Sequence, residues 1–321
     1  MECQPGGLCS LIDERDGKRY KSSPVPAGGR RAHGEPGRAV AASFRADGQP
    51  GGPRPRQLII TIYGLYARDE PNWLPIASLV RLMADLGVES QAVRSSVARL
   101  KRRELLISVR RSGTAGYALS PTSLEVLREG DARIFGRHRA AAGDGWVLVV
   151  FSVPESERDR RHKLRSWLSR LGFGTVAPGV WVAPGHLAGE VTEVLARRNL
   201  SGYVDIFRAD HLGFPDLAIK VGQWWDLDRL SAEYEQFIRG YRPLAKRIGS
   251  QAQALTGQDA FREYVSMLVA WQRLPYLDPG LPLELLPPHW NGITAGNVFA
   301  EINDHLGGPA MRHAESVILG A

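Results

Sequence analysis

Residues 88–103 read VESQAVRSSVARLKRR, which is the most informative stretch of the chain. Val93, Val97 and Leu100 follow the i, i+4, i+7 spacing that gathers apolar side chains on one face of a helix. The pattern predicts a short amphipathic helix, with Ser90 as the residue whose hydroxyl caps its first turn. Small, polar and basic side chains occupy the opposite face and its flank: Gln91, Arg94, Ser95, Ala98, Arg99 and Arg102.

A second amphipathic helix is predicted directly upstream over Pro75–Leu86, and Gly87 ends it. A helix, a tight turn and another helix make up the helix-turn-helix unit that many proteins use to bind DNA. Arg56–Tyr66 is expected to supply a first helix beneath this pair, although its Ile and Thr content also permits a strand.

The residues after the basic helix predict a hairpin. Leu105–Arg111 and Tyr117–Leu119 are short strand-like runs around the turn sequence SGTAG, with Arg110 and Arg111 at the base of that turn. Pro121–Arg137 is predicted to be a closing helix. Three helices and a basic hairpin describe a winged helix-turn-helix domain, which we predict over residues 56–138.

In this interpretation the helix from Ser90 enters the major groove of double-stranded DNA. Gln91, Arg94 and Ser95 are expected to read base edges, because amide, guanidinium and hydroxyl groups match the hydrogen-bonding pattern there. Arg99 and Arg102, with Arg110 and Arg111 of the hairpin, are expected to hold phosphates. Two alternatives remain open: an ordinary solvated helix face, or a basic helix that docks an acidic protein partner.

The charge of the chain is concentrated in the same region. The 321 residues favour two or three domains, and the formal net charge is +7. Residues 56–142 contain fourteen Lys and Arg against eight Asp and Glu, whereas residues 216–321 contain nine against twelve. A polyanion should therefore be attracted to one part of the molecule.

Residues 1–55 are rich in Gly, Pro, Arg and Ala without periodicity, which predicts a disordered basic tail. Both cysteines, Cys3 and Cys9, lie there, so no cysteine metal site is expected in the folded body. No apolar run approaches the roughly 20 residues that span a bilayer, and no secretory signal is evident. A cytoplasmic location without membrane contact is expected.

The pattern changes after a predicted linker at residues 138–145. Trp146–Val153 is a buried strand run, and the following residues predict the order β-α-β-β-α-β of a ferredoxin-like domain over residues 145–215. From residue 216 to residue 321 the chain is expected to be helical, with helices over Asp228–Tyr241, Ser250–Leu274 and about Thr294–Leu306. The predicted class is therefore α+β.

Three stretches resemble the PaaX family of transcriptional repressors. They are QAVRSSVARL (91–100), WLSRLGFGTVAPGVWVAP (167–184), and DPGLPLELLPPHWNG (278–292) preceded by FREYVSMLVAWQRL (261–274). The resemblance covers roughly residues 56–300. It implies a winged-helix domain, a central ferredoxin-like domain related to CRISPR-associated endoribonucleases, and a helical C-terminal domain for dimerisation and effector binding.

The resemblance also implies function. It implies a homodimer that binds an inverted-repeat operator, represses transcription, and is released by an aryl-acyl-CoA such as phenylacetyl-CoA. Arg262 and Trp290 lie in the segments most similar to the family, and the resemblance makes them candidates for effector binding. Neither a cofactor nor enzymatic activity is expected.

The alternative function is that of a metal-dependent nuclease using the ferredoxin-like domain. The CRISPR-associated endoribonucleases, to which the resemblance relates the central domain, hold a divalent cation with an aspartate near the end of their first strand. Here that strand is followed by Ser152 and Glu155 without an aspartate. The eight histidines are scattered and none forms a helical ligand pair with a carboxylate, so no metal site is expected.

Overall fold

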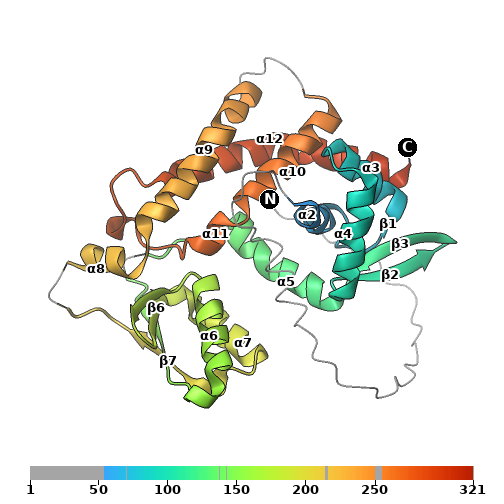
Figure 1. The fold of residues 1–321 in the computed structure, drawn as a ribbon. Coiled ribbons are helices and arrows are strands. Elements are labelled where there is room, and N and C mark those ends of the chain that lie inside the picture. The colour runs from blue at the N-terminus through green and yellow to red at the C-terminus, as the bar shows by residue number, and fades with distance from the viewer. Residues whose placement is uncertain are drawn as a thin grey trace, which may run out of the picture. The chain divides into compact units, whose positions relative to one another are not determined.

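The computed structural model describes residues 54–320 except residues 70, 137, 142, 214–215 and 250–254 (Figure 1). The predicted disordered tail of residues 1–55 thus lies outside the described residues, apart from its last two positions. Helices combine with two small antiparallel sheets, so the predicted α+β class is confirmed. Three segments follow one another: an N-terminal segment (54–136), a central segment (143–213) and a C-terminal segment (216–320).

The N-terminal segment combines helices with a three-stranded sheet. In chain order its elements are α2 (Pro55–Tyr66), β1 (Leu74–Pro75), α3 (Ile76–Asp85), α4 (Ser90–Arg102), β2 (Leu106–Arg111), β3 (Thr114–Leu119) and α5 (Pro121–Asp131). The predicted closing helix continues past α5 only as a π-helical turn, η1 (Ala132–Gly136). The sheet order is β1-β3-β2, and the sequence did not predict β1.

The first predicted element forms a helix rather than a strand. Pro55 occupies the first turn of α2, where its missing N–H costs nothing, and the Arg54 backbone N–H donates to the Gln57 side chain at 3.0 Å. Leu58, Ile60 and Tyr63 are almost fully buried, although they point in different directions around the helix. A helix that is apolar on every side is a central helix of a core, and this burial outweighs the weak strand preference of isoleucine.

The central segment has the observed element order β4 (Trp146–Phe151), α6 (Arg158–Arg170), β5 (Gly174–Ala177), β6 (Val180–Pro184), α7 (Ala188–Arg197) and β7 (Val204–Ala209), with short 3₁₀ turns between them. The strand order is β5-β6-β4-β7, and every pair is antiparallel. Val147 and Val149 of β4 pack with Leu164 and Leu168 of α6 in a separate core cluster. The strand predicted over Phe173–Val176 begins and ends one residue later.

The C-terminal segment is helical, as expected, but its helices differ from those predicted. They are α8 (Leu217–Trp224), α9 (Leu227–Gly249), α10 (Gly257–Trp271), α11 (Leu274–Leu277) and α12 (Asn291–Leu319). The predicted end of the last helix at Leu306 is wrong, because α12 continues through Pro309. Ala310 and Ala314 beyond this proline are completely buried, so packing holds a helix that local sequence would end.

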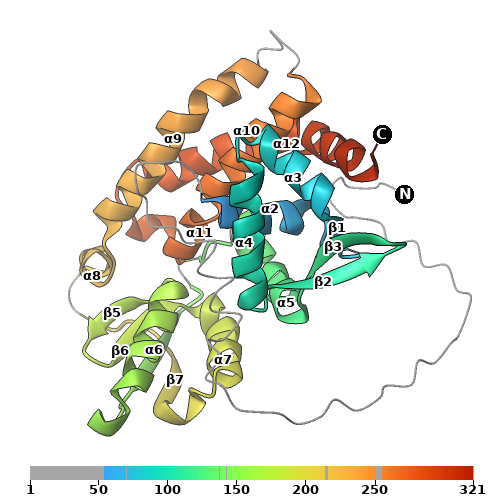
Figure 2. The ribbon, with the colours of Figure 1, turned by 45° about the vertical axis from the view of Figure 1, so that its right-hand side comes forward.

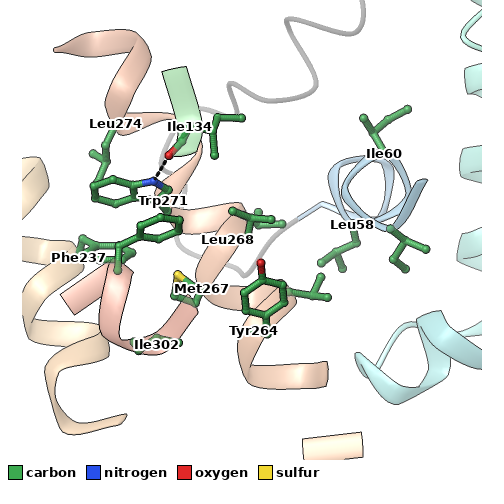
Figure 3. Close-up of a cluster of buried hydrophobic side chains, with 14 of the residues drawn as sticks. Leu58, Ile60, Ile134, Phe237, Tyr264, Met267, Leu268, Trp271, Leu274 and Ile302 are labelled. Atoms are coloured by element: carbon green, nitrogen blue, oxygen red, sulfur yellow. Dashed lines mark hydrogen bonds between the residues drawn. The ribbon is translucent and has the colours of Figure 1, made fainter. Parts of the chain in front are cut away.

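The N-terminal and C-terminal segments share one hydrophobic core. Figure 3 shows Leu58 of α2 on the side of that helix that faces Tyr264 and Leu268 of α10, whereas Ile60 extends from another side, and all four belong to one buried cluster. At the C-terminal end of α10, the Trp271 indole N–H donates to the Ile134 carbonyl of η1 at 2.9 Å (Figure 3). The orientation of the N-terminal helices therefore depends on the C-terminal helices.

Candidate nucleic-acid interface

The turn between α3 and α4 is built around Gly87. Its φ of +75° is in the left-handed region that favours glycine, and its N–H donates to the Ala84 carbonyl at 2.9 Å. The next N–H, that of Val88, donates to Met83 O at 2.9 Å. These bonds satisfy the last carbonyls of α3 and redirect the chain into α4, which lies across α2 in Figure 2.

The predicted cap of α4 is wrong by one residue. Glu89 is the N-cap, with extended backbone (φ −65°, ψ 146°), and Ser90 is already helical. No side chain caps this end, because Ser90 lies inside the helix and its hydroxyl no longer reaches the third N–H of the turn. The first turn of α4 therefore leaves its backbone N–H groups without a side-chain cap.

The two faces of α4 are divided as the sequence predicts. Val93, Val97 and Leu100 are at most 3% exposed, and Ser96 is buried beside them. All five predicted contact residues on the helix are exposed: Gln91, Arg94, Ser95, Arg99 and Arg102. Lys101 and the C-cap Arg103 are exposed as well, so the cationic end of α4 is larger than predicted. This charge also complements the negative end of the helix dipole.

The predicted hairpin is formed by β2 and β3 and closed by the two residues Ser112 and Gly113. Both have positive φ, +46° and +79°, which is typical of the tightest hairpin turns. Arg110 and Arg111 flank this turn and are exposed. Arg110 donates to Gly113 O at 3.2 Å within the same hairpin.

Trp73, which no sequence pattern marks, supports the hairpin. Its indole N–H donates to Val109 O at 3.3 Å, and the Arg111 guanidinium lies 5.9 Å from its ring centroid. Arg111 also donates to Pro71 O at 2.7 Å. A Cβ on Gly116 would lie 2.3 Å from Leu74 O and 2.5 Å from Trp73 Nε1, so only glycine fits there. The only sequence signal was an aromatic residue before Leu-Pro.

The cations of this surface share one electrostatic property. Within the part of the chain that the structure describes, no carboxylate lies within ion-pair distance of any of the six: Arg94, Arg99, Lys101, Arg102, Arg110 and Arg111. Elsewhere arginines are often paired, for example Arg133 with Glu190 and Arg139 with Asp278. We call these six residues, together with Gln91 and Ser95, the basic face.

The basic face is anchored to the C-terminal segment through Asp85, at the end of α3. Its carboxylate accepts from Gln258 Nε2 at 2.7 Å and lies 2.8 Å from His313 Nε2, and its carbonyl accepts from Arg262 Nε at 3.0 Å. Gln258 and Arg262 lie on α10, and His313 lies on α12. Two helices of the C-terminal segment therefore hold the end of the helix that precedes α4.

The two candidates for effector binding, Arg262 and Trp290, are in different surroundings. Arg262 is half exposed, and besides Asp85 its guanidinium contacts Asp259 at 3.2 Å. Trp290 is 4% exposed at the start of α12, edge-on to the Tyr234 ring, with a buried indole nitrogen that has no partner among the described residues. The structure does not bring the two together. A role of Arg262 and Trp290 in effector binding therefore stays a prediction.

The central segment holds the residues of the nuclease alternative. Ser152 is exposed after β4, and Glu155 forms an ion pair with Arg161 at 2.9 Å. Across the described ranges, no three His, Cys, Asp or Glu side chains are grouped so that they could hold a metal ion. In the same ranges, no helix combines the length and apolar character that crossing a membrane requires.

Comparison with known proteins gives the family. Three family models match in order: "PaaX-like protein" over residues 54–123, "PaaX protein central Cas2-like domain" over 139–221, and "PaaX-like protein C-terminal domain" over 225–316. The chain is 30% identical over 243 residues to the transcriptional repressor PaaX of Escherichia coli (strain K12), covering 74% of this chain and 76% of that protein. The chain belongs to the PaaX family. As a PaaX-family protein it is a transcriptional regulator rather than an enzyme.

A solved structure resembles this PaaX-family fold. It is the uncharacterized protein Rv0674 from Mycobacterium tuberculosis, with a TM-score of 0.52 and 23% sequence identity. The match covers 80% of this chain and 97% of that one. At this identity the likeness concerns the fold alone.

Proposed function

We propose that the protein is a DNA-binding transcriptional repressor in which the N-terminal segment acts as a winged helix-turn-helix domain. The observation that carries the proposal is the basic face: exposed cations without carboxylate partners surround a helix whose other side is buried. The match to a transcriptional repressor over most of both chains supports the same conclusion.

In the proposed complex α4 lies in the major groove. Gln91, Arg94 and Ser95 contact base edges, because they occupy the first half of α4, which enters the groove in this docking mode. Arg99, Arg102, Arg110 and Arg111 contact phosphates on either side. Lys101 joins this second group, since it is exposed and unpaired in the last turn.

We further propose the domain division 56–138, 145–215 and 216–321, with a ferredoxin-like fold in the middle. The three family matches, over residues 54–123, 139–221 and 225–316, support it, as do the strand order β5-β6-β4-β7 and the separate core of the central segment.

The proposed active form is a cytoplasmic homodimer. A twofold dimer reads an inverted repeat whose half-sites are separated by a whole number of helical turns of about 10–10.5 bp each. The proposed effector is an acyl-CoA, supported by the family resemblance. It would need to prefer one arrangement of the two α4 helices by about 1–3 kcal/mol to release the operator.

The test is footprinting of the full-length protein on the promoter regions flanking its own gene, with labelled DNA and added Mg²⁺. Protection of an inverted repeat without strand cutting is the expected result. Cutting would favour the nuclease alternative. Absence of any protected site, together with binding to an acidic protein, would show that the basic face serves a protein partner.

A further inference from the structure

The exposed side of α6 in the central segment is strongly basic. Of the nine Lys and Arg residues among residues 143–215, six lie in α6, whereas only one of the eight Asp and Glu residues does. Leu164 and Leu168 are completely buried in the central core. Four exposed residues follow the spacing i, i+4, i+7, i+11 that gathers side chains along one side of a helix: Arg158, His162, Arg165 and Ser169. We call these four residues the basic stripe.

The two arginines of the basic stripe have no acidic partner. Within the described ranges, no carboxylate lies within ion-pair distance of Arg158 or Arg165. The preceding Glu155 pairs with Arg161 at 2.9 Å instead. Asp159 is the one acidic residue of α6, and neighbours i and i+1 on a helix do not face each other, so it does not neutralise Arg158. Both guanidinium groups can therefore bind an anion outside the protein.

Helix stability does not account for these cations. Arg158, Arg160 and Arg161 occupy the first turn of α6, where the positive end of the helix dipole disfavours positive charge. Arg160 lies over the Tyr203 ring at 5.9 Å and Arg161 pairs with Glu155, so Arg158 is left without compensation. A solvated face that served folding alone would carry acidic residues in this turn. An external anion would remove the unfavourable interaction.

The length of the basic stripe matches a DNA strand. Arg158 and Arg165 are seven residues apart, which is about 10 Å at 1.5 Å per residue. Each strand of a duplex carries one phosphate per about 3.4 Å of axis, so the stripe spans about three successive phosphates. Guanidinium, imidazole and hydroxyl groups all donate to phosphate oxygens, and the stripe contains no apolar side chain.

Contacts through α5 connect α6 to the helix-turn-helix. At the start of α5, Ser123 Oγ donates to Leu105 O at 3.0 Å, shortly after the end of α4. Farther along α5, Val126 and Glu129 line a small cavity together with Trp167 of α6. The two helices have 11 and 13 residues, together about 36 Å long. The basic stripe therefore lies within about one helical turn of DNA, 34–36 Å, of the end of α4.

We propose that the basic stripe binds the phosphate backbone of double-stranded DNA beside the half-site that α4 reads. This inference rests on the proposed function, which it extends from the N-terminal segment to the central one. The contact adds affinity without reading sequence, because phosphates are the same at every base pair. It also makes the footprint longer than the inverted repeat itself.

The test is fluorescence anisotropy of the full chain with two duplexes from the footprinted promoter. The short duplex contains only the inverted repeat, and the long one continues for about 20 bp, two helical turns, on each side. The test variant combines Arg158→Ala with Arg165→Ala, and a second one carries lysine at both positions. The matched control combines Arg239→Ala with Arg242→Ala, which removes two exposed charges from α9. Salt titrations and thermal melts accompany each protein.

The expected result is a loss confined to the long duplex. The alanine variant should bind it about tenfold more weakly at low salt, and the slope of log K against log[salt] should fall by about two units, one for each lost cation. The lysine variant and the α9 control should bind both duplexes as the wild type does. The alanine variant should melt no earlier than the wild type, because Arg158 opposes the helix dipole.

The proposal is overturned if the alanine variant binds the long duplex as the α9 control does, or if it binds both duplexes more weakly to the same extent. If the double variant melts early, Arg165→Ala alone decides, with an expected slope change of about one unit. A wild type that protects no promoter sequence contradicts the proposed function. Operator binding by the wild type with no effect of the alanine variant contradicts the basic stripe alone.

Discussion

Arg94 is exposed in the second turn of α4, five residues before Arg99, whereas the preceding Val93 is buried. In the proposed complex it contacts a base edge. Arg94→Ala should therefore weaken operator binding by about 1–3 kcal/mol and relax sequence choice at one position. Competition fluorescence anisotropy against operator and random DNA measures both effects. Arg239→Ala, an exposed arginine on α9, is the control. An equal loss of affinity for operator and random DNA would show that Arg94 contacts a phosphate.

Arg111 is expected to act differently, since it lies beside the hairpin turn and is held by Pro71 O and the Trp73 ring. Arg111→Ala should weaken binding to every DNA alike and reduce the slope of log K against log[salt] by about one unit. Salt titrations of wild type, Arg111→Ala and Arg110→Ala measure this. If Arg111 only supports the hairpin, its variant loses thermal stability while the salt slope stays unchanged.

His186 gives a pH prediction. Its ordinary pKa of 6.5 applies in the unfolded chain, whereas burial lowers the folded value to about 4. Between these two values the unfolded state binds more protons, so stability falls as the pH falls through this window. The wild type should therefore lose stability relative to His186→Phe from about pH 6.5 to pH 4. Urea unfolding at several pH values measures the difference, and a difference that is constant across the window would contradict the prediction.

At the scale of elements, the sheet of the N-terminal segment depends on Gly116. A methyl group there would meet the Leu74 backbone oxygen at 2.3 Å, and backbone cannot move aside as a side chain does. Gly116→Ala should separate β1 from β3 and cost about 1–3 kcal/mol of stability, the range for overpacking. A Cβ added at Gly240 on α9 would meet no atom within 4 Å, so Gly240→Ala should stabilise the protein slightly. Thermal unfolding of both variants measures these changes. If Gly116→Ala is as stable as the wild type, Trp73 and Leu74 do not pack tightly against Gly116.

Elements whose pattern is local could be predicted from the sequence, and those held by distant contacts could not. The buried face of α4 can be predicted from Val93, Val97 and Leu100, because a helix with one buried and one exposed face repeats its apolar residues with the helical period. The sequence does not show whether α2 is a helix or a strand, because a segment that is buried on all sides has no periodic pattern of apolar and polar residues. The end of α12 could not be predicted, because Ala310 and Ala314 keep the helix going through contacts with other parts of the molecule.

The same limit applies to the candidate site. Exposure of the predicted contact residues of α4 and the hairpin follows from periodicity and turn chemistry. Trp73 and Asp85 could not be found, because their roles come from Val109 and from Gln258 and His313, which are distant in sequence. The prediction for Arg262 and Trp290 rests on family resemblance alone, and similarity in a segment does not separate packing residues from ligand-binding ones.

At the scale of the whole molecule, the shared core predicts how the chain folds. Leu58, Ile60 and Tyr63 of α2 are buried in a cluster that includes α10 and α12. Most buried apolar residues of the central segment form a cluster of their own, and only Trp146 and Val182 of that segment join the first. A fragment of residues 54–136 would expose the α2 residues that α10 covers, and each large apolar side chain exposed costs about 1.5–3 kcal/mol. A domain is stable by only about 5–15 kcal/mol, so this fragment should not fold alone.

Residues 143–213 should fold by themselves, because Val147, Val149, Leu164 and Leu168 bury one another within that segment. Proton–nitrogen NMR spectra of the two fragments measure this contrast: dispersed peaks are expected for the central fragment and collapsed ones for the N-terminal fragment. A dispersed spectrum for residues 54–136 would mean that α2 does not need α10. The basic face could then rotate independently of the C-terminal segment. A ligand bound to the C-terminal segment would in that case have no rigid connection to α4.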